Sequence, residues 1–304
     1  MIKLENISKQ FQDTLALDNI CFEVSKAKMT ILAGPDGSGK STLFRIILGL
    51  LGMDKGHIFF DGDDIGGNFS LITSRTGYMP ERFSLYPDLN VEENLNFFAD
   101  IHQIPRRQRE ERKETLLKKT GMFPFIKRRA GNLSGGMKQK LSLSAILLSA
   151  PECVILDEPT TGVDPLSRIE FYNILNELKK EGKTLLLSTP YLDDAEKGDI
   201  VVFINRGRII KKGAIQKLKK NFPSKTYSIL PRGNVLDVLD KLQKDDRFKN
   251  NVYLKGQYIK YLGQDSRDIS TIPHIHLKEE KPRLEDIYIY YEKQTLNTYE
   301  DGHD

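Results

Sequence analysis

GPDGSGKS, residues 34 to 41, is a glycine-rich stretch between the apolar run MTILA and the helical pattern STLFRIILGL. Glycines let successive backbone amides turn toward an anion, and the following helix begins with N–H groups that have no partner. A loop of this composition between a strand and a helix predicts a phosphate-binding loop. In it Lys40 reaches the β- and γ-phosphates of a nucleotide, and the Ser41 hydroxyl is offered to magnesium. A plain glycine-rich turn is the alternative reading.

Around this loop, short apolar runs alternate with longer helical patterns from the first residue to about residue 220. The expected strands are IKLENI, ICFEV, MTILAG, HIFF, CVILD, KTLLLS, DIVVFI and GRIIK. Strands with interleaved helices predict an α/β fold with a largely parallel sheet that helices cover. Residues 85 to about 148 show only helical patterns, which predicts a helical subdomain inserted in residues 1–220. Within it, the run PRRQREERKETLLKK is typical of a solvated helix with opposite charges.

The composition narrows the class of protein. The chain has 304 residues, more than one typical domain, and 46 Lys+Arg against 42 Asp+Glu, a balance too even to indicate nucleic acid. Cys21 and Cys153 stand in apolar runs and are expected to be buried thiols of a reduced, cytosolic chain. The sequence contains no window of about 20 apolar residues, so any membrane role is expected to come through a partner.

A second acidic motif, CVILDEPT, occupies residues 153 to 160. Four apolar residues predict a buried strand, and two adjacent carboxylates follow at its carboxyl end. Because neighbouring side chains on a strand point apart, the two can have different roles. Asp157 is expected to ligate magnesium, and Glu158 to orient and deprotonate an attacking water.

A third motif, LSGGMKQK, begins at residue 133 and precedes a helical pattern. Ser134 is a good N-cap, and Gly135 and Gly136 leave the first amides of the helix bare, which predicts a second anion site. Taken alone, the motif is more typical of a simple helix cap.

Together these motifs resemble the ATP-binding cassette (ABC) family over residues 1 to about 215. GPDGSGKST resembles its Walker A loop, VILDEP its Walker B strand, LSGGM its signature and TGVDP, residues 161–165, its D-loop. The resemblance implies the P-loop NTPase fold, ATP and Mg²⁺ as cofactors, and ATPase activity. It implies nucleotide contacts from Gly34, Pro35, Asp36, Gly37, Ser38, Gly39, Lys40, Ser41 and Thr42.

The resemblance also implies a head-to-tail dimer with a second ATP-binding subunit, identical or different. In such a dimer Ser134, Gly135 and Gly136 contact the partner's γ-phosphate, and Asp164 lies at the subunit interface. Phe11 stands where the family stacks an aromatic ring on adenine; a plain core aromatic is the alternative.

Two positions depart from the family pattern. Glu81 replaces a glutamine that helps to hold magnesium and water. Pro190, in STPYLDDAE, replaces the switch histidine that contacts the γ-phosphate, so a transition-state donor is missing. Two interpretations stay open: a slow or regulatory site whose partner subunit is competent, or a site in which Glu158 suffices as base and Thr189, Glu81 or water replaces the contact.

After residue 220, short strands and one helical pattern predict a small α+β accessory domain over residues 221–304. Its segment KPRLEDIYIYYEK resembles the end of ATPase subunits that pair with ABC-2 type permeases of exporters, although a capped terminal helix also fits Leu284, Glu285 and Asp286. This implies a separate transmembrane permease that docks near Arg82, Phe83 and Tyr86, and a place on the inner face of the cell membrane.

Two other classes of ABC protein fit the sequence less well, and a third alternative stays open. ABC proteins of chromosomes and DNA repair have a long coiled coil between the phosphate loop and the signature, whereas this chain has no heptads there. Translation factors of the family have two cassettes, whereas this chain has one. A non-hydrolysing nucleotide sensor is the third alternative, and Pro190 is the feature that favours it.

Overall fold

The computed structural model of the chain describes residues 1–82, 85–270 and 272–300. The predicted contact at Phe83 lies outside the described residues. By its contacts the chain divides into two units, Met1–Ile209 and Ile210–Asp304, each described here by itself.

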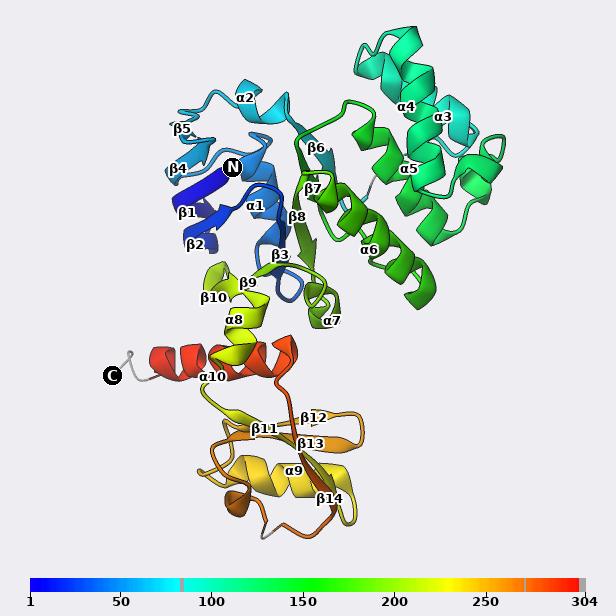
Figure 1. Cartoon of the computed structure of the whole chain (residues 1–304). Helices are drawn as coiled ribbons and strands as arrows, with labels where there is room; N and C mark the ends of the chain where they lie inside the picture. Colours follow the sequence, from blue (N-terminus) through cyan, green and yellow to red (C-terminus); the bar gives the residue numbers. More distant parts are fainter. Residues whose placement is uncertain (83–84, 271, 301–304) are drawn as a thin grey trace. The chain divides into compact units, whose positions relative to one another are not determined.

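The centre of the first unit is a six-stranded sheet with the order β10-β9-β3-β8-β7-β6 (Figure 1). Its strands are β3 (Met29–Ala33), β6 (Thr76–Met79), β7 (Cys153–Leu156), β8 (Thr184–Thr189), β9 (Ile200–Asn205) and β10 (Arg208–Ala214). The five strands from β9 to β6 pair in parallel. All residues of β3, β7 and β8 are buried, which is why these strands read as continuous apolar runs.

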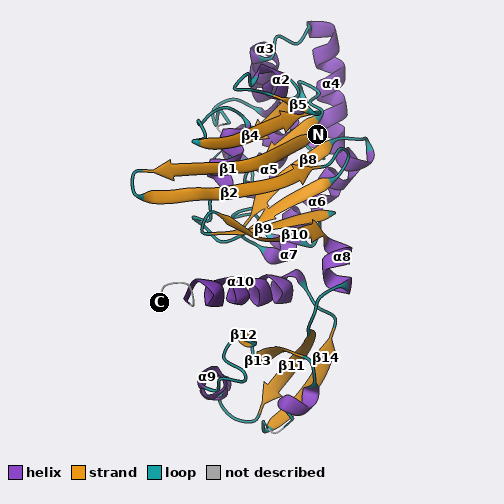
Figure 2. Ribbon diagram, turned by 90° about the vertical axis from the view of Figure 1, so that its left-hand side faces the viewer, coloured by secondary structure: helices purple, strands orange, loops and turns teal. Residues whose placement is uncertain are grey.

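The first strands of the chain do not join this sheet, so the expectation of a single largely parallel sheet is wrong for them. β1 (Ile2–Phe11), β2 (Thr14–Val24), β4 (Lys55–Phe60) and β5 (Asp63–Asp64) form a separate antiparallel sheet (Figure 2). Their alternating burial indicates one solvated face, which a parallel sheet covered by helices lacks. The core of the unit lies between the two sheets and α1 (Lys40–Ile47), with Phe44 and Phe60 among its fully buried side chains.

Two further helices follow the strands that carry the acidic and proline motifs. Pro165–Lys180 forms α6, which begins at a favourable N-terminus: Asp164 caps it and Pro165 occupies the first position. Leu192–Ala195 forms the short α7 directly after β8. A four-residue helix, α2 (Ser70–Thr73), precedes β6.

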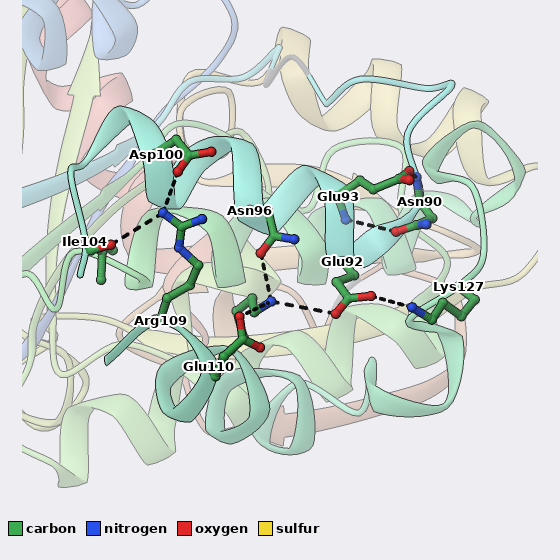
Figure 3. A network of polar contacts seen from close by, with 10 residues as sticks. Asn90, Glu92, Glu93, Asn96, Asp100, Ile104, Arg109, Glu110 and Lys127 are labelled. Carbon is green, nitrogen blue, oxygen red and sulfur yellow. Dashed lines mark hydrogen bonds and ion pairs between the residues drawn. The ribbon is translucent and has the colours of Figure 1, made fainter. Parts of the chain in front are cut away.

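Between residues 85 and 148 the described chain is helical. It contains α3 (Val91–Ile101), α4 (Arg106–Lys119) and α5 (Gly135–Leu147), which lie together in Figure 1, with 3-10 turns at Phe123–Phe125 and Ala130–Asn132. Figure 3 shows polar contacts that tie α3 to its neighbours, including the capping box of Asn90 and Glu93 and the ion pair of Glu92 with Lys127. The charged run of α4 is mostly exposed, as its composition predicts.

The second unit contains a four-stranded antiparallel sheet with the order β12-β13-β11-β14. Its elements are α8 (Ile215–Lys220), β11 (Lys225–Pro231), α9 (Val235–Lys244), β12 (Val252–Lys255), β13 (Tyr258–Gly263), β14 (His274–Glu280) and α10 (Leu284–Glu300). In chain order the strands are arranged 2-3-1-4, the topology of a ferredoxin-like sheet. Helix α9 packs on the face that presents Tyr227, Ile229 and Ile259. Both views place α10 on the other side (Figures 1 and 2).

The predicted terminal motif has a structural role. Leu284 is fully buried, and the Asp286 carboxylate accepts from the Arg283 amide at 2.6 Å and from the Tyr253 hydroxyl at 2.5 Å. Glu285 pairs with Lys255 on β12. These contacts cap α10 and hold it to the sheet. No described helix combines the length and apolar character needed to cross a bilayer.

Candidate active site

The site is built where three neighbouring parallel strands end. β8 lies between β3 and β7 in the sheet, and Ala33 pairs with Thr189. The phosphate loop, the acidic pair and Pro190 follow these three strands directly, so the topology brings them to one edge. In open parallel sheets this edge is where ligands bind.

The phosphate loop opens α1 without a side-chain cap. Gly39 occupies the N-cap position with φ 102°, and the first turn of α1 contains no acidic residue. A Cβ at Gly34 would lie 2.0 Å from the Ile204 carbonyl oxygen, so only glycine fits there. Because no side chain caps α1, its first amides stay available to bind an anion such as phosphate.

Lys40 is held in place inside the loop. Its side chain is 3% exposed, and Nζ donates to the carbonyl oxygens of Gly34 and Pro35, each at 2.9 Å. Nζ also lies 3.2 Å from Oε1 of Glu158, whereas the Asp36 carboxylate is 3.9 Å away and almost fully exposed. The ammonium thus sits between the loop and the predicted base, where it can meet phosphate oxygens.

Glu158 has a strained backbone. Its φ of 48° lies in the left-handed region, which costs a non-glycine residue free energy and requires surrounding structure to hold it. The strand ends at Leu156, so strand alternation does not separate the two carboxylates; this turn does. Thr161 Oγ1 donates to Glu158 Oε2 at 3.2 Å.

Ser188 orients both acidic residues, a role that the sequence reading did not assign. Its hydroxyl donates to Asp157 Oδ1 at 2.5 Å and accepts from the Glu158 amide at 2.8 Å. Ser188 is fully buried and Asp157 is 2% exposed. A polar residue at the carboxyl end of an apolar strand was the available signal, but the partner depended on strand order.

A cleft of about 520 Å³ joins most of these groups. Its lining contains Thr14, Leu15, Ala16, Asp36, Gly37, Gly39, Lys40, Ser41, Thr42, Glu81, Glu158, Thr161, Arg206 and Gly207. Glu81 therefore faces the same space as Lys40 and Glu158. Phe11 does not line the cleft: the residue is 44% exposed, and its ring lies under the Lys9 ammonium. The start of β2 forms the wall of the cleft instead.

The donors fit magnesium, provided that substrate phosphates and water complete the shell. No group of three or more His, Cys, Asp or Glu side chains arranged for a metal exists among the residues described. The Ser41 hydroxyl with the Asp157 and Glu81 carboxylates is a hard oxygen set, and magnesium is typically held by one or two carboxylates plus phosphates and waters.

The buried charge of Asp157 affects its neighbourhood. Burial and then the negative charge of Asp157 raise the pKa of Tyr78 to about 12, while Arg45 partly opposes the rise. The Tyr78 phenol therefore stays protonated to a higher pH than an exposed tyrosine does.

The signature residues do not line this chain's own cleft. Ser134 caps α5, accepting from the Met137 amide at 3.3 Å, and both Ser134 and Gly135 are exposed. Gly136 is buried against α6, where a Cβ would lie 2.4 Å from Ser167 Cβ. Asp164 is also outside the cleft, and its bond from the Ser167 amide lowers the pKa of its carboxyl.

Pro190 ends the middle strand. The Gly34 amide donates to the Thr189 carbonyl at 3.2 Å, and the Tyr191 amide donates to Thr189 Oγ1 at 3.0 Å. Both bonds engage Thr189, so its side chain is occupied by the turn. Pro190 is not among the residues that line the cleft.

Comparison with known proteins agrees with this geometry. A family model described as ABC transporter matches residues 17–161. The chain is 35% identical over 298 residues to the probable multidrug ABC transporter ATP-binding protein YbhF of Escherichia coli (strain K12), covering 95% of this chain and 51% of that protein. It therefore spans about half the length of that relative.

Two further matches cover most of the compared protein. The daunorubicin resistance ATP-binding protein DrrA3 of Streptomyces coeruleorubidus is 32% identical over 219 residues, 72% of this chain and 69% of that protein. Among solved structures, the ADP conformation of MJ1267, an ATP-binding cassette of an ABC transporter, is 29% identical with a TM-score of 0.66, covering 73% of this chain and 93% of that one. The motifs, the fold and these relationships show that the chain belongs to the ABC transporter family, as one of its ATP-binding proteins.

Proposed function

We propose that the chain is the ATP-hydrolysing subunit of an ABC exporter, and that it drives a separate membrane permease. The observation that carries the proposal is the intact Glu158, held 3.2 Å from Lys40 beside the phosphate loop. The names of the relatives, a probable multidrug ABC transporter protein and a daunorubicin resistance protein, support the exporter class.

In this proposal each group at the sheet edge has one task. The loop amides and Lys40 bind the phosphates, and the Glu158 carboxylate accepts a proton from the attacking water. Ser41, Asp157 and Glu81 would hold Mg²⁺, which neutralises charge on the phosphate oxygens when it is bound. Ser188 holds Asp157 and Glu158 in place through its bonds to the Asp157 carboxylate and the Glu158 amide.

Two cassettes are proposed to close head to tail on ATP. Ser134 and Gly135 are exposed and away from this chain's own cleft, which leaves them free to complete a partner's site. Asp164 begins α6 near exposed apolar side chains, since Leu166 is 67% and Ile169 53% exposed. Such apolar surface favours association.

The permease is proposed to dock on the helical region. A hollow of about 300 Å³ there is lined by Arg82 and Leu85 together with Glu81 of the cleft. Because one residue lines both spaces, a permease segment at this hollow would sense the state of the cleft. Docking would place the chain on the inner face of the cell membrane.

Pro190 favours a second candidate, a slow or regulatory subunit whose partner hydrolyses ATP. Proline cannot donate a hydrogen bond to a phosphate. Thr189, a proposed substitute, already bonds to the Tyr191 amide. This candidate predicts ATP binding with little turnover.

Mg²⁺-dependent ATP hydrolysis by the purified full chain, compared with Glu158→Gln, tests the proposal. We expect steady native turnover and a loss of at least about a hundredfold in the variant, the contribution of a general base. Glu177→Gln, on the exposed face of α6, is the matched control and is expected to keep native turnover. An equal rate in Glu158→Gln and the native chain contradicts the role of Glu158. Tight ATP binding without native turnover supports the second candidate.

A further inference from the structure

Asp194 is a buried carboxylate beside the loop that carries Glu158. It is 3% exposed and lies on α7, four residues after Pro190. Its Oδ2 accepts from Thr160 Oγ1 at 2.8 Å, and Thr160 is 1% exposed. Thr160 is two residues after Glu158, so this bond links the end of β8 to the acidic turn after β7.

Arg168 on α6 makes a second link to the same segment. Its Nη1 lies 3.7 Å from Asp194 Oδ1, and its guanidinium carbon lies 4.7 Å from the centre of the Tyr191 ring. Arginine stacks well on tyrosine, and the planar group restricts the ring that it covers. The residues that follow Pro190 are thus attached at two points.

The buried position of the Asp194 carboxylate destabilises its charged form. Burial is the main cause that raises the pKa of Asp194, opposed by Thr160, Arg168 and Lys197, while Asp193 adds to the rise. Burial, and then the charge of Asp194, also raise the pKa of the Tyr172 hydroxyl. A buried charge without an ideal partner is a poor source of stability. The contacts that Asp194 makes therefore explain its presence better than a contribution to stability does.

The loop that receives this bond is under strain. Glu158 has a positive φ, and such conformations persist only where the surroundings fix them. Ser188 holds the Glu158 amide from one side. The Thr160 hydroxyl is the next side-chain attachment along the loop, and the Thr160 carbonyl accepts from Val163 at 3.2 Å.

We infer that Asp194 is a positioning residue: through Thr160 it fixes the turn that aims Glu158, and with Arg168 and Tyr191 it ties the segment after Pro190 to that turn. The link supplies, from four residues downstream, an attachment that the proline side chain cannot make. The inference rests on the proposed ATP hydrolysis for its kinetic consequence but not for its structural one.

The kinetic test uses the full chain with Thr160→Val, Asp194→Ala and the double variant. We expect each single change to lower kcat at least tenfold with KM for ATP within twofold, because the change affects aim and not binding. The double variant is expected to be no slower than the slower single variant, because both remove one link. Asp193→Ala, an exposed neighbour, is the control and keeps native kinetics.

A second readout does not need turnover. Hydrogen–deuterium exchange of residues 157–164 without nucleotide is expected to speed up in Thr160→Val and in Asp194→Ala, and not in Asp193→Ala. Unchanged kcat and exchange in Thr160→Val, or losses that multiply independently in the double variant, overturn the inference. If the native chain hydrolyses no ATP, the proposed function fails, and the exchange result alone decides the inference.

Discussion

The Ser188 hydroxyl lies 2.5 Å from the Asp157 carboxylate, and both side chains are buried. Ser188→Ala removes this donor and leaves a buried carboxylate oxygen without it, and it also leaves the Glu158 amide without its acceptor. We expect a loss of about 1–3 kcal/mol in the free energy of unfolding. Urea denaturation monitored by circular dichroism measures it, and ATP turnover is expected to fall in parallel.

Ser149→Ala is the matched control for this deletion. Ser149 is exposed in the turn after α5, and its hydroxyl donates to the Ile146 carbonyl three residues earlier. Its loss is expected to change unfolding by less than about 0.5 kcal/mol. Equal effects of the two deletions would mean that Ser188 does not support the acidic pair.

Pro190→His restores a donor at the end of β8. We expect kcat to rise at least about tenfold, since one transition-state donor is typically worth more than that, and KM for ATP to stay within twofold. Pro190→Ala frees the backbone without adding a donor and is expected to give no gain. An equal rise in both variants would attribute the effect to the backbone, and no rise in either would show that the site compensates for the proline.

Two buried polar residues of α3 and α4 are expected to differ sharply in importance. Asn94 is fully buried, and its side chain bonds to the Tyr86 amide and to three backbone carbonyls. Asn94→Leu leaves the Tyr86 amide without its acceptor, and each of the three carbonyls keeps one backbone donor but loses the amide of the side chain. We expect a loss of about 1–3 kcal/mol in the free energy of unfolding. Exchange of the amides at 85–90 should accelerate.

Lys113→Met is the contrasting variant in the same region. The Lys113 ammonium bonds to Asn96 at 2.7 Å and pairs with Glu110 at 2.9 Å and with Glu92 at 3.7 Å. The Glu110 side chain is 69% exposed, and Glu92 keeps its ion pair with Lys127. Removing the lysine leaves no buried charge behind, and methionine keeps most of the packed volume. We expect a change below about 1 kcal/mol in the same denaturation experiment; a loss equal to that of Asn94→Leu would contradict this account.

Tyr78 predicts a pH dependence. Its pKa is raised to about 12 in the folded chain, first by burial and then by Asp157, whereas an unfolded tyrosine titrates near 10. Between about pH 10 and 12 the unfolded chain releases this proton while the folded chain keeps it, so stability falls as pH rises through that window.

Carbon-13 tyrosine NMR, assigned with Tyr78→Phe, measures this pKa. Asp157→Asn is expected to lower the pKa of Tyr78, because it removes the negative charge that raises this pKa together with burial. Titration of Tyr78 near 10 in the native chain would contradict the buried environment described here.

The motifs that are proposed to bind phosphate could be recognised in the sequence because they are local. GPDGSGKS needs only a strand before it and a helix after it, and both flanks are visible in the sequence. The apolar runs of β3, β7 and β8 likewise predict buried parallel strands. The order of the strands, which brings the motifs together, is not a local property of the sequence. Ser188 contacts Asp157 only because β8 lies between β3 and β7.

The remaining differences have similar causes. β1, β2 and β4 form their own antiparallel sheet, although their short apolar runs look like those of the parallel strands. β14 was not predicted because its pattern, HIHLKEE, is polar at an exposed sheet edge. The positive φ of Glu158 follows from packing around the turn, since glutamate has no local preference for that conformation.

The two cysteines give the chain an internal chemical reporter. Cys153 on β7 has no exposed surface, and burial raises its thiol pKa to about 12, whereas Cys21 on β2 is only half-buried. A thiol-specific reagent can therefore reach the Cys153 sulfur only when the central sheet opens. The rate at which Cys153 is modified in a Cys21→Ser background would measure how often that sheet opens, without any added label in the site itself.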